Sequence, residues 1–244
     1  WKSVAVNLSD LAAMGAKPHS ILLALSLPTV DHGWLAGFSQ GLFDCCDQFG
    51  VSLIGGDTTQ SSQLTITVTA LGWIEHGQAI TRSGAQVGDY ICVSGQVGDA
   101  AFGLQHPGHA LQQRLDYPTP RCVLGQQLKG LASSMIDVSD GLAQDLGHIL
   151  KASNVGAKLQ LDQLPIDESL KKLEKQQAWH YALAGGDDYE LCFTISPQNF
   201  EKLSRQQLDV PLTIIGKITQ KTGLLFEYMG ENYPLQIHGY QHFA

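Results

Sequence analysis

Apolar positions in the first part of the chain alternate between helical and strand spacing. Val4, Leu8 and Leu11 form one stripe at helical spacing, and Pro18 follows the end of that stripe. Residues 19–28 are largely apolar, which indicates a buried strand. The pattern therefore predicts a helix with one core-facing side, followed directly by a strand.

A second helix and two further strands follow in the same way. Asp31 is a favourable N-cap, and Gly50 marks the end of a helix whose apolar residues share one face. Residues 51–54 predict a short strand that runs into the polar sequence GGDTT at 55–59. In residues 64–74 apolar side chains alternate with threonine, which predicts a strand with one buried face.

The second part of the chain repeats this alternation after a polar connection. Residues 81–89 are polar and contain glycine, so we expect a boundary there between one domain at 1–80 and another at 81–244. A favourable cap and first helical position, Ser196 and Pro197, predict a helix between two strands. Alternating strands and helices favour an α/β or α+β fold of two layers. Beyond the connection, strands are expected at 90–95, 157–165, 189–195 and 212–218, and helices at 98–106, 120–133 and around 137–148.

Composition and charge narrow the class of protein. The 244 residues are 43% hydrophobic and 16% charged, which indicates a globular chain with a buried core. The formal net charge of −8 disfavours broad binding to nucleic acid or to an anionic membrane, so we expect neither as a partner. A protein of this charge that handles phosphates needs metal ions or a few well-placed basic groups.

Cysteine usage and hydropathy indicate a cytoplasmic protein. The five cysteines are odd in number and contain no C-x-x-C pair, so we expect buried, reduced thiols. No apolar run reaches membrane-spanning length, and no secretory signal precedes the predicted elements.

Four acidic motifs carry the candidate chemistry, and each places an aspartate beside glycine or serine. They are NLSDL with Asp10, GGDTT with Asp57, DVSDG with Asp137 and Asp140, and GGDDYEL with Asp187 and Asp188. Carboxylates bind hard cations through oxygen, and small neighbours let a phosphate approach the backbone. Together the motifs suggest one shared site for Mg²⁺ and a nucleotide.

Each aspartate also has a purely structural interpretation. Asp140 is a favourable helix N-cap, Asp57 after two glycines is typical of a turn, and Asp10 fits a solvated helix face. Asp145 and His148 resemble an ordinary pair, either on the surface or behind the residues that would bind a metal ion. The histidines lack metal-ligand spacing, and the chain contains neither a P-loop nor a dinucleotide-binding glycine motif, so any ATP site has another architecture.

Five sequences in this order carry a resemblance to a known family: AVNLSDLAAMGAKP, LIGGDTT, TRSGAQVGD, DVSDGL and GGDDYEL. Together with the ending GYQHF, they resemble the thiamine-monophosphate kinases over essentially the whole chain. The wider superfamily, which includes aminoimidazole ribonucleotide synthetase and selenophosphate synthetase, shares a two-domain fold with mixed sheets and an acid-rich ATP site. The resemblance implies ATP-dependent phosphorylation of thiamine monophosphate to thiamine diphosphate, with several Mg²⁺ ions and a homodimeric full-length protein.

The family pattern also implies roles for individual residues. The substrate's phosphate oxygen is the nucleophile and is already ionised near neutral pH, so no general base is required. No catalytic residues are expected beyond those that bind the metal ions and ATP. The implied metal ligands are Asp10, Asp57, Asp137 and Asp140; the implied ATP contacts are Gly56, Asp57, Arg82 and Ser139; and the implied substrate contacts are Asp187 and Tyr240.

Two departures from the family pattern leave alternatives open. Family members usually carry glutamate where this chain has Asp187. They also carry a preceding segment with a Gly-Asp-Asp metal motif, a substrate-contacting histidine and strands of a dimer barrel. Without that segment we expect residues 1–80 to be the remainder of an ATP-binding, metal-binding and dimerisation domain. Two alternatives to the kinase function remain. The chain could be a catalytically silent nucleotide-binding or assembly protein, or it could be another ATP-dependent enzyme of the superfamily.

Overall fold

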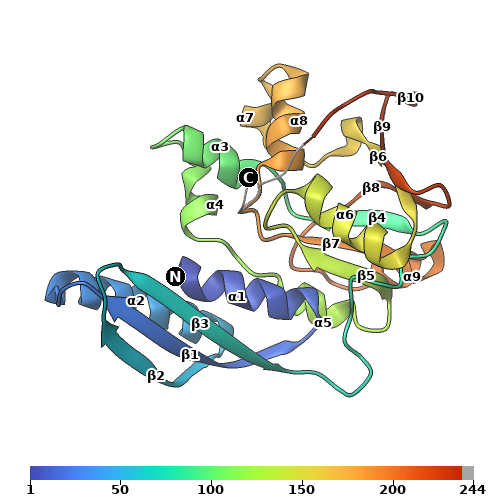
Figure 1. Ribbon diagram of the computed structural model, residues 1–244. Coiled ribbons are helices and arrows are strands. Elements are labelled where there is room, and N and C mark those ends of the chain that lie inside the picture. The colour runs from blue at the N-terminus through green and yellow to red at the C-terminus, as the bar shows by residue number, and fades with distance from the viewer. Residues whose placement is uncertain (238–244) are drawn as a thin grey trace.

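In the computed structural model, which describes residues 1–237, the chain forms two β-sheets with helices packed on them (Figure 1). The first sheet has the strand order β2-β1-β3, and the second has the order β10-β9-β6-β8-β4-β7-β5. Both sheets mix parallel and antiparallel pairs, since β1 pairs parallel with β2 and β6 pairs parallel with β9. The expected α/β class with mixed sheets is confirmed.

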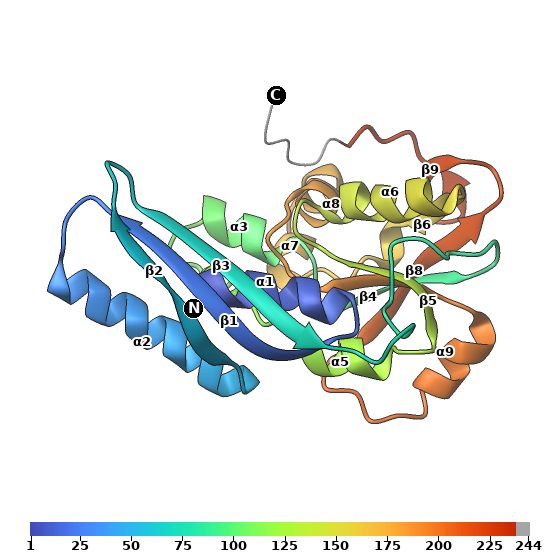
Figure 2. The same cartoon turned by 60° about the horizontal axis from the view of Figure 1, so that its bottom comes forward.

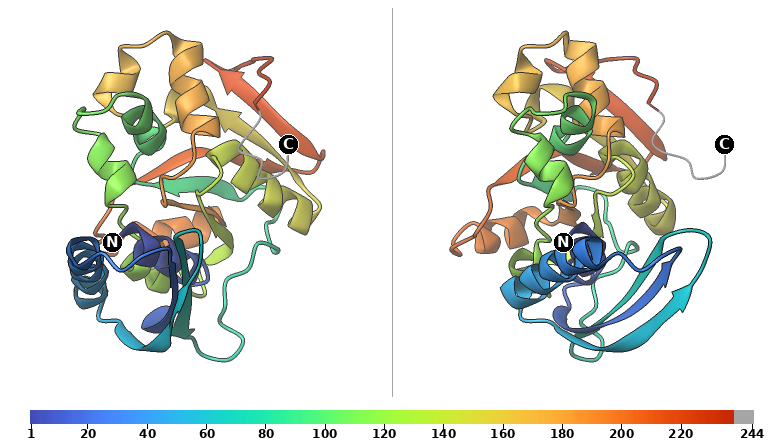
Figure 3. Two further views of the ribbon diagram at one scale, coloured as in Figure 1. Left: turned by 60° about the vertical axis from the view of Figure 1, so that its left-hand side comes forward. Right: turned by 90° about the vertical axis from the view of Figure 1, so that its left-hand side faces the viewer.

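Within residues 1–237, the first sheet has helices on one face only. β1 (Lys17–Leu27) lies between β2 (Ser52–Gln60) and β3 (Thr65–Trp73). The helices α1 (Lys2–Ala13) and α2 (His32–Phe49) lie on the same side of this sheet (Figures 2 and 3). The other face points away from the rest of the chain.

Local sequence signals fix α2 as predicted. The Asp31 side chain accepts hydrogen bonds from the amides of Gly33 and Trp34, at 2.8 and 3.0 Å. Gly50 ends the helix in the left-handed region, with φ of 63°. Both predicted ends of this helix are therefore confirmed.

The predicted short strand at 51–54 is longer than expected, because β2 continues through GGDTT to Gln60. A Cβ atom on Gly56 would lie 1.8 Å from the carbonyl oxygen of Leu23 on the neighbouring strand. This close approach of the two backbones requires glycine at position 56, whether or not a phosphate binds there.

The second sheet and its helices are formed by elements between Tyr90 and Asn232. Two expectations need correction. The helix expected at 120–133 ends at Gln127, and β5 begins at Ala132. The strand expected at 157–165 ends at Gln160 and is followed by a 3₁₀ turn. The helix capped by Ser196 is confirmed, with the Ser196 side chain accepting from the Asn199 amide. The strands are β4 (Tyr90–Ser94), β5 (Ala132–Asp137), β6 (Gly156–Gln160), β7 (Leu191–Ile195), β8 (Leu212–Thr219), β9 (Gly223–Tyr228) and β10 (Glu231–Asn232). The helices are α3 (Asp99–Gln105), α4 (Gln112–Asp116), α5 (Cys122–Gln127), α6 (Leu142–Ser153), α7 (Glu168–Lys171), α8 (Lys175–Ala184) and α9 (Pro197–Leu203), with the 3₁₀ turn at Leu161–Gln163.

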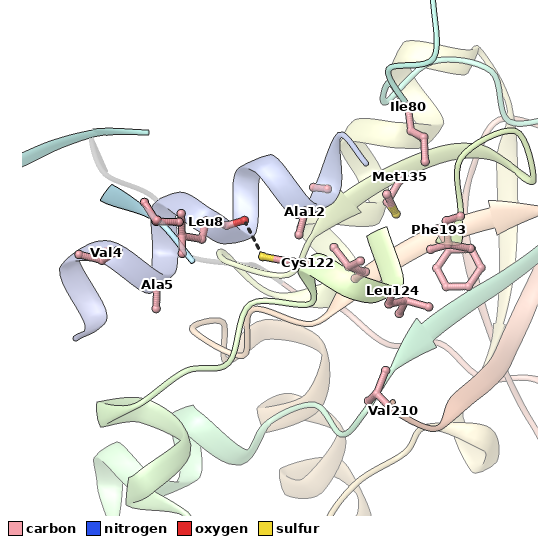
Figure 4. Packing of buried hydrophobic residues seen from close by; sticks show 14 of the residues in the cluster. Val4, Ala5, Leu8, Ala12, Ile80, Cys122, Leu124, Met135, Phe193 and Val210 are labelled. Atoms are coloured by element: carbon pink, nitrogen blue, oxygen red, sulfur yellow. Dashed lines mark hydrogen bonds between the residues drawn. The ribbon is translucent and has the colours of Figure 1, made fainter. Parts of the chain in front are cut away.

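One hydrophobic cluster joins the two parts of the chain. Leu8 of α1 packs in the same cluster as Leu124 of α5 and Phe193 of β7 (Figure 4). The Cys122 thiol donates to the carbonyl oxygen of Leu8 at 3.8 Å. α1 therefore has its position fixed from both sides, by the first sheet and by α5 and β5.

All five cysteines of the chain lie within the described residues. All five thiols are buried and none forms a disulfide. Burial raises their pKa values, which keeps the thiols protonated at neutral pH. None of the helices within residues 1–237 is both long and apolar enough to span a bilayer.

Candidate functional site

A cavity of about 490 Å³ opens where α1 meets the end of β5 and the loop before β7. A second cavity of about 310 Å³ adjoins it, because Asp10 and Asp137 line both. The first cavity is lined by Val6, Asp10, Leu104, Asp137, Ser139, Asp140, Gly185, Asp187 and Tyr189, and the second adds Ala13, Met14, Ile80, Thr81, Arg82, Met135 and Ile136.

The structure brings six of the nine implied site residues to these two cavities. Asp57 is exposed on β2, where its carboxylate accepts from the Thr58 amide at 2.8 Å, and it lines neither cavity. Gly56 precedes it on the same strand. Tyr240 lies outside the described residues. The six at the cavities are Asp10, Arg82, Asp137, Ser139, Asp140 and Asp187.

Helix α1 presents Asp10 to the cavities from its polar side. The next residue toward the N-terminus, Ser9, is fully buried and donates a hydrogen bond to the Asp137 carboxylate at 2.7 Å. Asp137 is the last residue of β5. The Ser9 bond therefore links the helix to the strand end, although the two residues are 128 positions apart in sequence.

Most of the DVSDG segment is a loop, so the helix expected around 137–148 begins later than predicted. Asp137 ends β5, and α6 begins at Leu142 with Gly141 as its N-cap. Gly141 has φ of 118°, a conformation that other residues rarely adopt. Asp140 is therefore not the helix cap, and its side chain faces the cavity and Gln144 instead.

Asp145 organises this loop from the inside. Its side chain is 2% exposed, so the surface alternative expected for Asp145 and His148 is wrong, and a structural role behind the site residues fits Asp145. One carboxylate oxygen accepts from the amides of Ser139, Asp140 and Gly141, at 3.0, 3.0 and 3.2 Å. These amides are consequently not available to a phosphate in this conformation.

The GGDDYEL loop forms the opposite wall and has a strained backbone. Gly186, Asp187 and Tyr189 all lie at positive φ, with values of 68°, 61° and 52°. Non-glycine residues at positive φ are uncommon and often occur at functional sites. The Asp187 amide donates to the carbonyl oxygen of Ser139 at 2.8 Å, which joins this loop to DVSDG.

Two side chains that the sequence did not single out hold Asp187 in place. The Tyr189 hydroxyl donates to one carboxylate oxygen at 2.9 Å. The Lys2 ammonium lies 3.1 Å from the other oxygen, and both of these charged groups are about one third exposed. A cation of this chain is thus already paired with the acid that the family pattern assigns to substrate.

Glu190 forms a buried ionic centre behind the loop. Its side chain is fully buried and accepts from Arg114 at 2.6 Å, from Ser94 at 2.5 Å and from both Nε and Nη2 of Arg121. Arg114 and Arg121 belong to the α4–α5 segment, while Glu190 directly precedes β7. The centre therefore fixes the base of the GGDDYEL loop against that segment.

Burial and mutual repulsion raise the pKa values of several acids near the cavities. Burial raises the pKa of Asp137 to about 6; the Asp10 charge adds to this rise, and the Ser9 hydrogen bond opposes it. Burial also raises the pKa of Asp10, against the opposing effect of Arg82. Carboxylates held together in this way repel one another until a cation compensates them.

The donor set at the cavities fits Mg²⁺ in one particular manner. Within residues 1–237 no three acidic, histidine or cysteine side chains converge to hold one ion by themselves. Mg²⁺ is usually bound through one or two carboxylates, with water and substrate phosphates completing the shell. Paired oxygen ligands such as Asp10 with Asp137 match that requirement.

The raised pKa of Asp137 predicts a pH-dependent stability. Because the folded chain binds this proton more tightly than the unfolded chain, the contribution is full below the ordinary pKa of 3.8 and is lost as pH rises through about 6. We expect the Mg²⁺-free full-length protein to lose about 1 kcal/mol from this group between pH ~5 and pH ~7.5.

Thermal unfolding at both pH values, with wild type and Asp137→Asn, measures that contribution. The variant should lack this part of the pH dependence, and Mg²⁺ should raise the wild-type melting temperature more at the higher pH. Identical pH profiles for the two proteins would contradict the prediction.

Comparison with known proteins first defines the class. The sequence model "AIR synthase related protein, N-terminal domain" matches residues 1–74, and the model of the corresponding C-terminal domain matches residues 86–227. Hydrogenase maturation protein HypE in complex with ATP has a TM-score of 0.78 at 19% identity over 97% of this chain and 78% of that chain, a likeness of fold alone. The chain is thus an AIR synthase related protein.

Closer relatives define the family within that class. The chain is 46% identical to thiamine-monophosphate kinase of Haemophilus influenzae and 47% identical to that of Escherichia coli K12, over its whole length and 79% of each relative. The crystal structure of thiamine-monophosphate kinase from Stenotrophomonas maltophilia K279a has a TM-score of 0.87 at 45% identity, covering 96% of this chain and 78% of that chain. AaThiL complexed with AMPPCP and TMP has the same TM-score at 30% identity, covering 100% and 79%. This chain belongs to the thiamine-monophosphate kinase family, as its motifs predicted.

Proposed function

We propose that the full-length protein transfers the terminal phosphoryl group of ATP to thiamine monophosphate and so forms thiamine diphosphate, with Mg²⁺. One observation carries the proposal. Aspartates from three segments that are distant in sequence, α1, DVSDG and GGDDYEL, line one cavity. A relative with the same fold, AaThiL, has been crystallised with AMPPCP and TMP.

The chemistry requires positioning and charge neutralisation. The attacking oxygen of a phosphate is already ionised, so the reaction needs no general base, and the main obstacle is the approach of two anions. Mg²⁺ would supply positive charge between them. Asp10, Asp137 and Asp140 would hold the ions, with Asp57 as a further proposed ligand on β2.

Other residues of the chain would bind the two substrates. Arg82 lines the adjoining cavity, and its guanidinium group can donate two parallel hydrogen bonds to a phosphate. Gly56 and Ser139 are the remaining proposed ATP contacts. Asp187 can pair with the cationic or amino-bearing part of thiamine, and Tyr240 is the proposed aromatic partner.

Direct measurement of thiamine diphosphate tests the proposed function. The full-length protein, thiamine monophosphate, ATP and Mg²⁺ should yield thiamine diphosphate and ADP in equal amounts. Addition of excess EDTA should abolish the product, and unphosphorylated thiamine should be a poor acceptor. Absence of product with the full-length protein at saturating Mg²⁺ would reject the proposal and favour a silent nucleotide-binding chain.

The proposal includes a homodimeric full-length protein. The outer face of the first sheet exposes Leu22, Ile54, Leu71 and Trp73, and large exposed apolar patches are typical of interfaces. We expect light scattering of the full-length protein to give the mass of a dimer and Ile54→Glu to shift it toward monomer. A monodisperse wild-type monomer would contradict this.

The buried thiols, none of which forms a disulfide, favour a reducing compartment such as the cytoplasm.

A further inference from the structure

The three amides that converge on Asp145 form the kind of concave site that usually binds an external anion. They belong to consecutive residues, Ser139, Asp140 and Gly141, immediately before the first turn of α6. Backbone amides at such a position attract phosphates in many nucleotide-binding proteins. Here the carboxylate of Asp145, four positions after Gly141 in the same chain, occupies the site, and the Asp145 side chain is 2% exposed.

This arrangement separates the two sides of the DVSDG loop. The amides of the loop point inward to Asp145, while Asp137, Ser139 and Asp140 line the cavity. The carbonyl oxygen of Ser139 accepts from the Asp187 amide at 2.8 Å, and the Val138 carbonyl accepts from the Tyr189 amide at 2.9 Å. The loop is therefore held by its backbone on both sides, which leaves its acidic side chains available for a cation.

Burial raises the pKa of Asp145, whereas the hydrogen bonds from the amides of Asp140 and Ser139 favour its charged form, and it is this charged form that the loop amides bind strongly. Hydrogen bonds from an amide to a carboxylate are roughly twice as strong as those between neutral groups. The three amides share one oxygen, so neutralising that oxygen weakens all three bonds together. Asp145 itself lines neither cavity.

We infer that Asp145 is a positioning residue: it acts as an internal anion that fills the amide site of the DVSDG loop and so orients Asp137 and Asp140 for Mg²⁺. A nucleotide phosphate then reaches this wall through the cation rather than through the loop amides. The inference rests on the proposed function for its catalytic consequence. Its structural core, an amide site filled by a carboxylate of the same chain, holds independently.

The variant Asp145→Asn in the full-length protein tests the metal part. It keeps the size of the side chain and removes the charge. Loss of an outer partner of a metal ligand typically lowers metal affinity about 10–100-fold. We expect the half-saturating Mg²⁺ concentration to rise at least about tenfold, the KM for thiamine monophosphate to stay near the wild-type value, and high Mg²⁺ to recover most of kcat.

Asp31→Asn is the matched control. Asp31 also accepts backbone amides at a helix start, yet it is exposed on α2 and lines neither cavity. Its Mg²⁺ dependence should equal that of wild type. If Asp145→Asn lowers only the melting temperature and leaves the Mg²⁺ dependence unchanged, Asp145 is merely structural and the inference is overturned.

Two readouts separate this inference from the proposed kinase activity. Mn²⁺ binding to the full-length protein, followed by water proton relaxation, should weaken in Asp145→Asn even if no reaction is found. Amide hydrogen exchange can be measured on the wild-type protein, so it does not depend on the folding of a variant. The amides of residues 139–141 should be protected from exchange in the absence of metal and nucleotide. Fast exchange there, slowed only after Mg²⁺ and AMPPCP are added, would overturn the inference.

Discussion

Replacing Asp140 with asparagine in the full-length protein should lower thiamine diphosphate formation by about 10²–10³-fold, the usual effect of removing one electrostatic stabiliser of a transition state. Asparagine has no formal charge and is a weaker ligand for a hard cation than aspartate. The charge that develops on the transferring phosphoryl group would then be poorly neutralised. Raising the Mg²⁺ concentration should recover part of the lost rate.

The same variant should unfold at nearly the wild-type temperature in the absence of ligand. Asp140 is only partly buried, and the cap of α6 is Gly141, so no helix cap is lost. Turnover against Mg²⁺ concentration, together with melting curves, measures both effects. Asp162→Asn makes the same chemical change at an exposed position outside both cavities and serves as the control. Unchanged turnover in Asp140→Asn would exclude Asp140 as a metal ligand.

Glu190→Gln should cause the largest loss of stability, about 3 kcal/mol in the free energy of unfolding. The change leaves Arg114 and Arg121 without the carboxylate that neutralises them, although both guanidinium groups are mostly buried, at 24% and 15% exposed. An arginine deprived of its buried partner retains the desolvation penalty and loses the compensating attraction.

Denaturant unfolding of Glu190→Gln beside Glu201→Gln measures this difference. Glu201 of α9 pairs with Arg205, which follows the end of that helix, and the two side chains are 68% and 74% exposed. Exposed pairs of this kind contribute only about 0.3–0.5 kcal/mol. Losses of equal size in the two variants would mean that the buried centre around Glu190 contributes no more than a surface pair.

Local sequence determined those features of this protein that depend on neighbouring residues. Asp31 and Gly50 fix the ends of α2, and Ser196 caps α9, because each acts on amides or carbonyls within its own helical turn. The alternation of spacings gave the α/β class. The order of the acidic motifs identified the family, since several short patterns in one order rarely coincide.

Where local patterns compete, the sequence was less reliable. The helix expected at 120–133 ends early because Ala132 and the residues after it pair with β7, and strand pairing is decided by a partner some sixty positions away. GGDTT was expected to follow a strand, but it is part of β2 because its residues pair in parallel with β1. Both errors reflect long-range contacts overriding local preference.

Only the tertiary structure decided which acids share a site and which support it. Asp10 and Asp137 meet because α1 packs against β5, and no spacing in the sequence encodes that contact. Asp145 lies on the same helix face as Leu146 and Ile149, so an acid in an apolar stripe was the one available signal of its buried role. The direction of its carboxylate, toward three amides and away from solvent, depends on how the loop before α6 folds. Side-chain convergence is set by packing in three dimensions, whereas motifs and caps are set by neighbours along the chain.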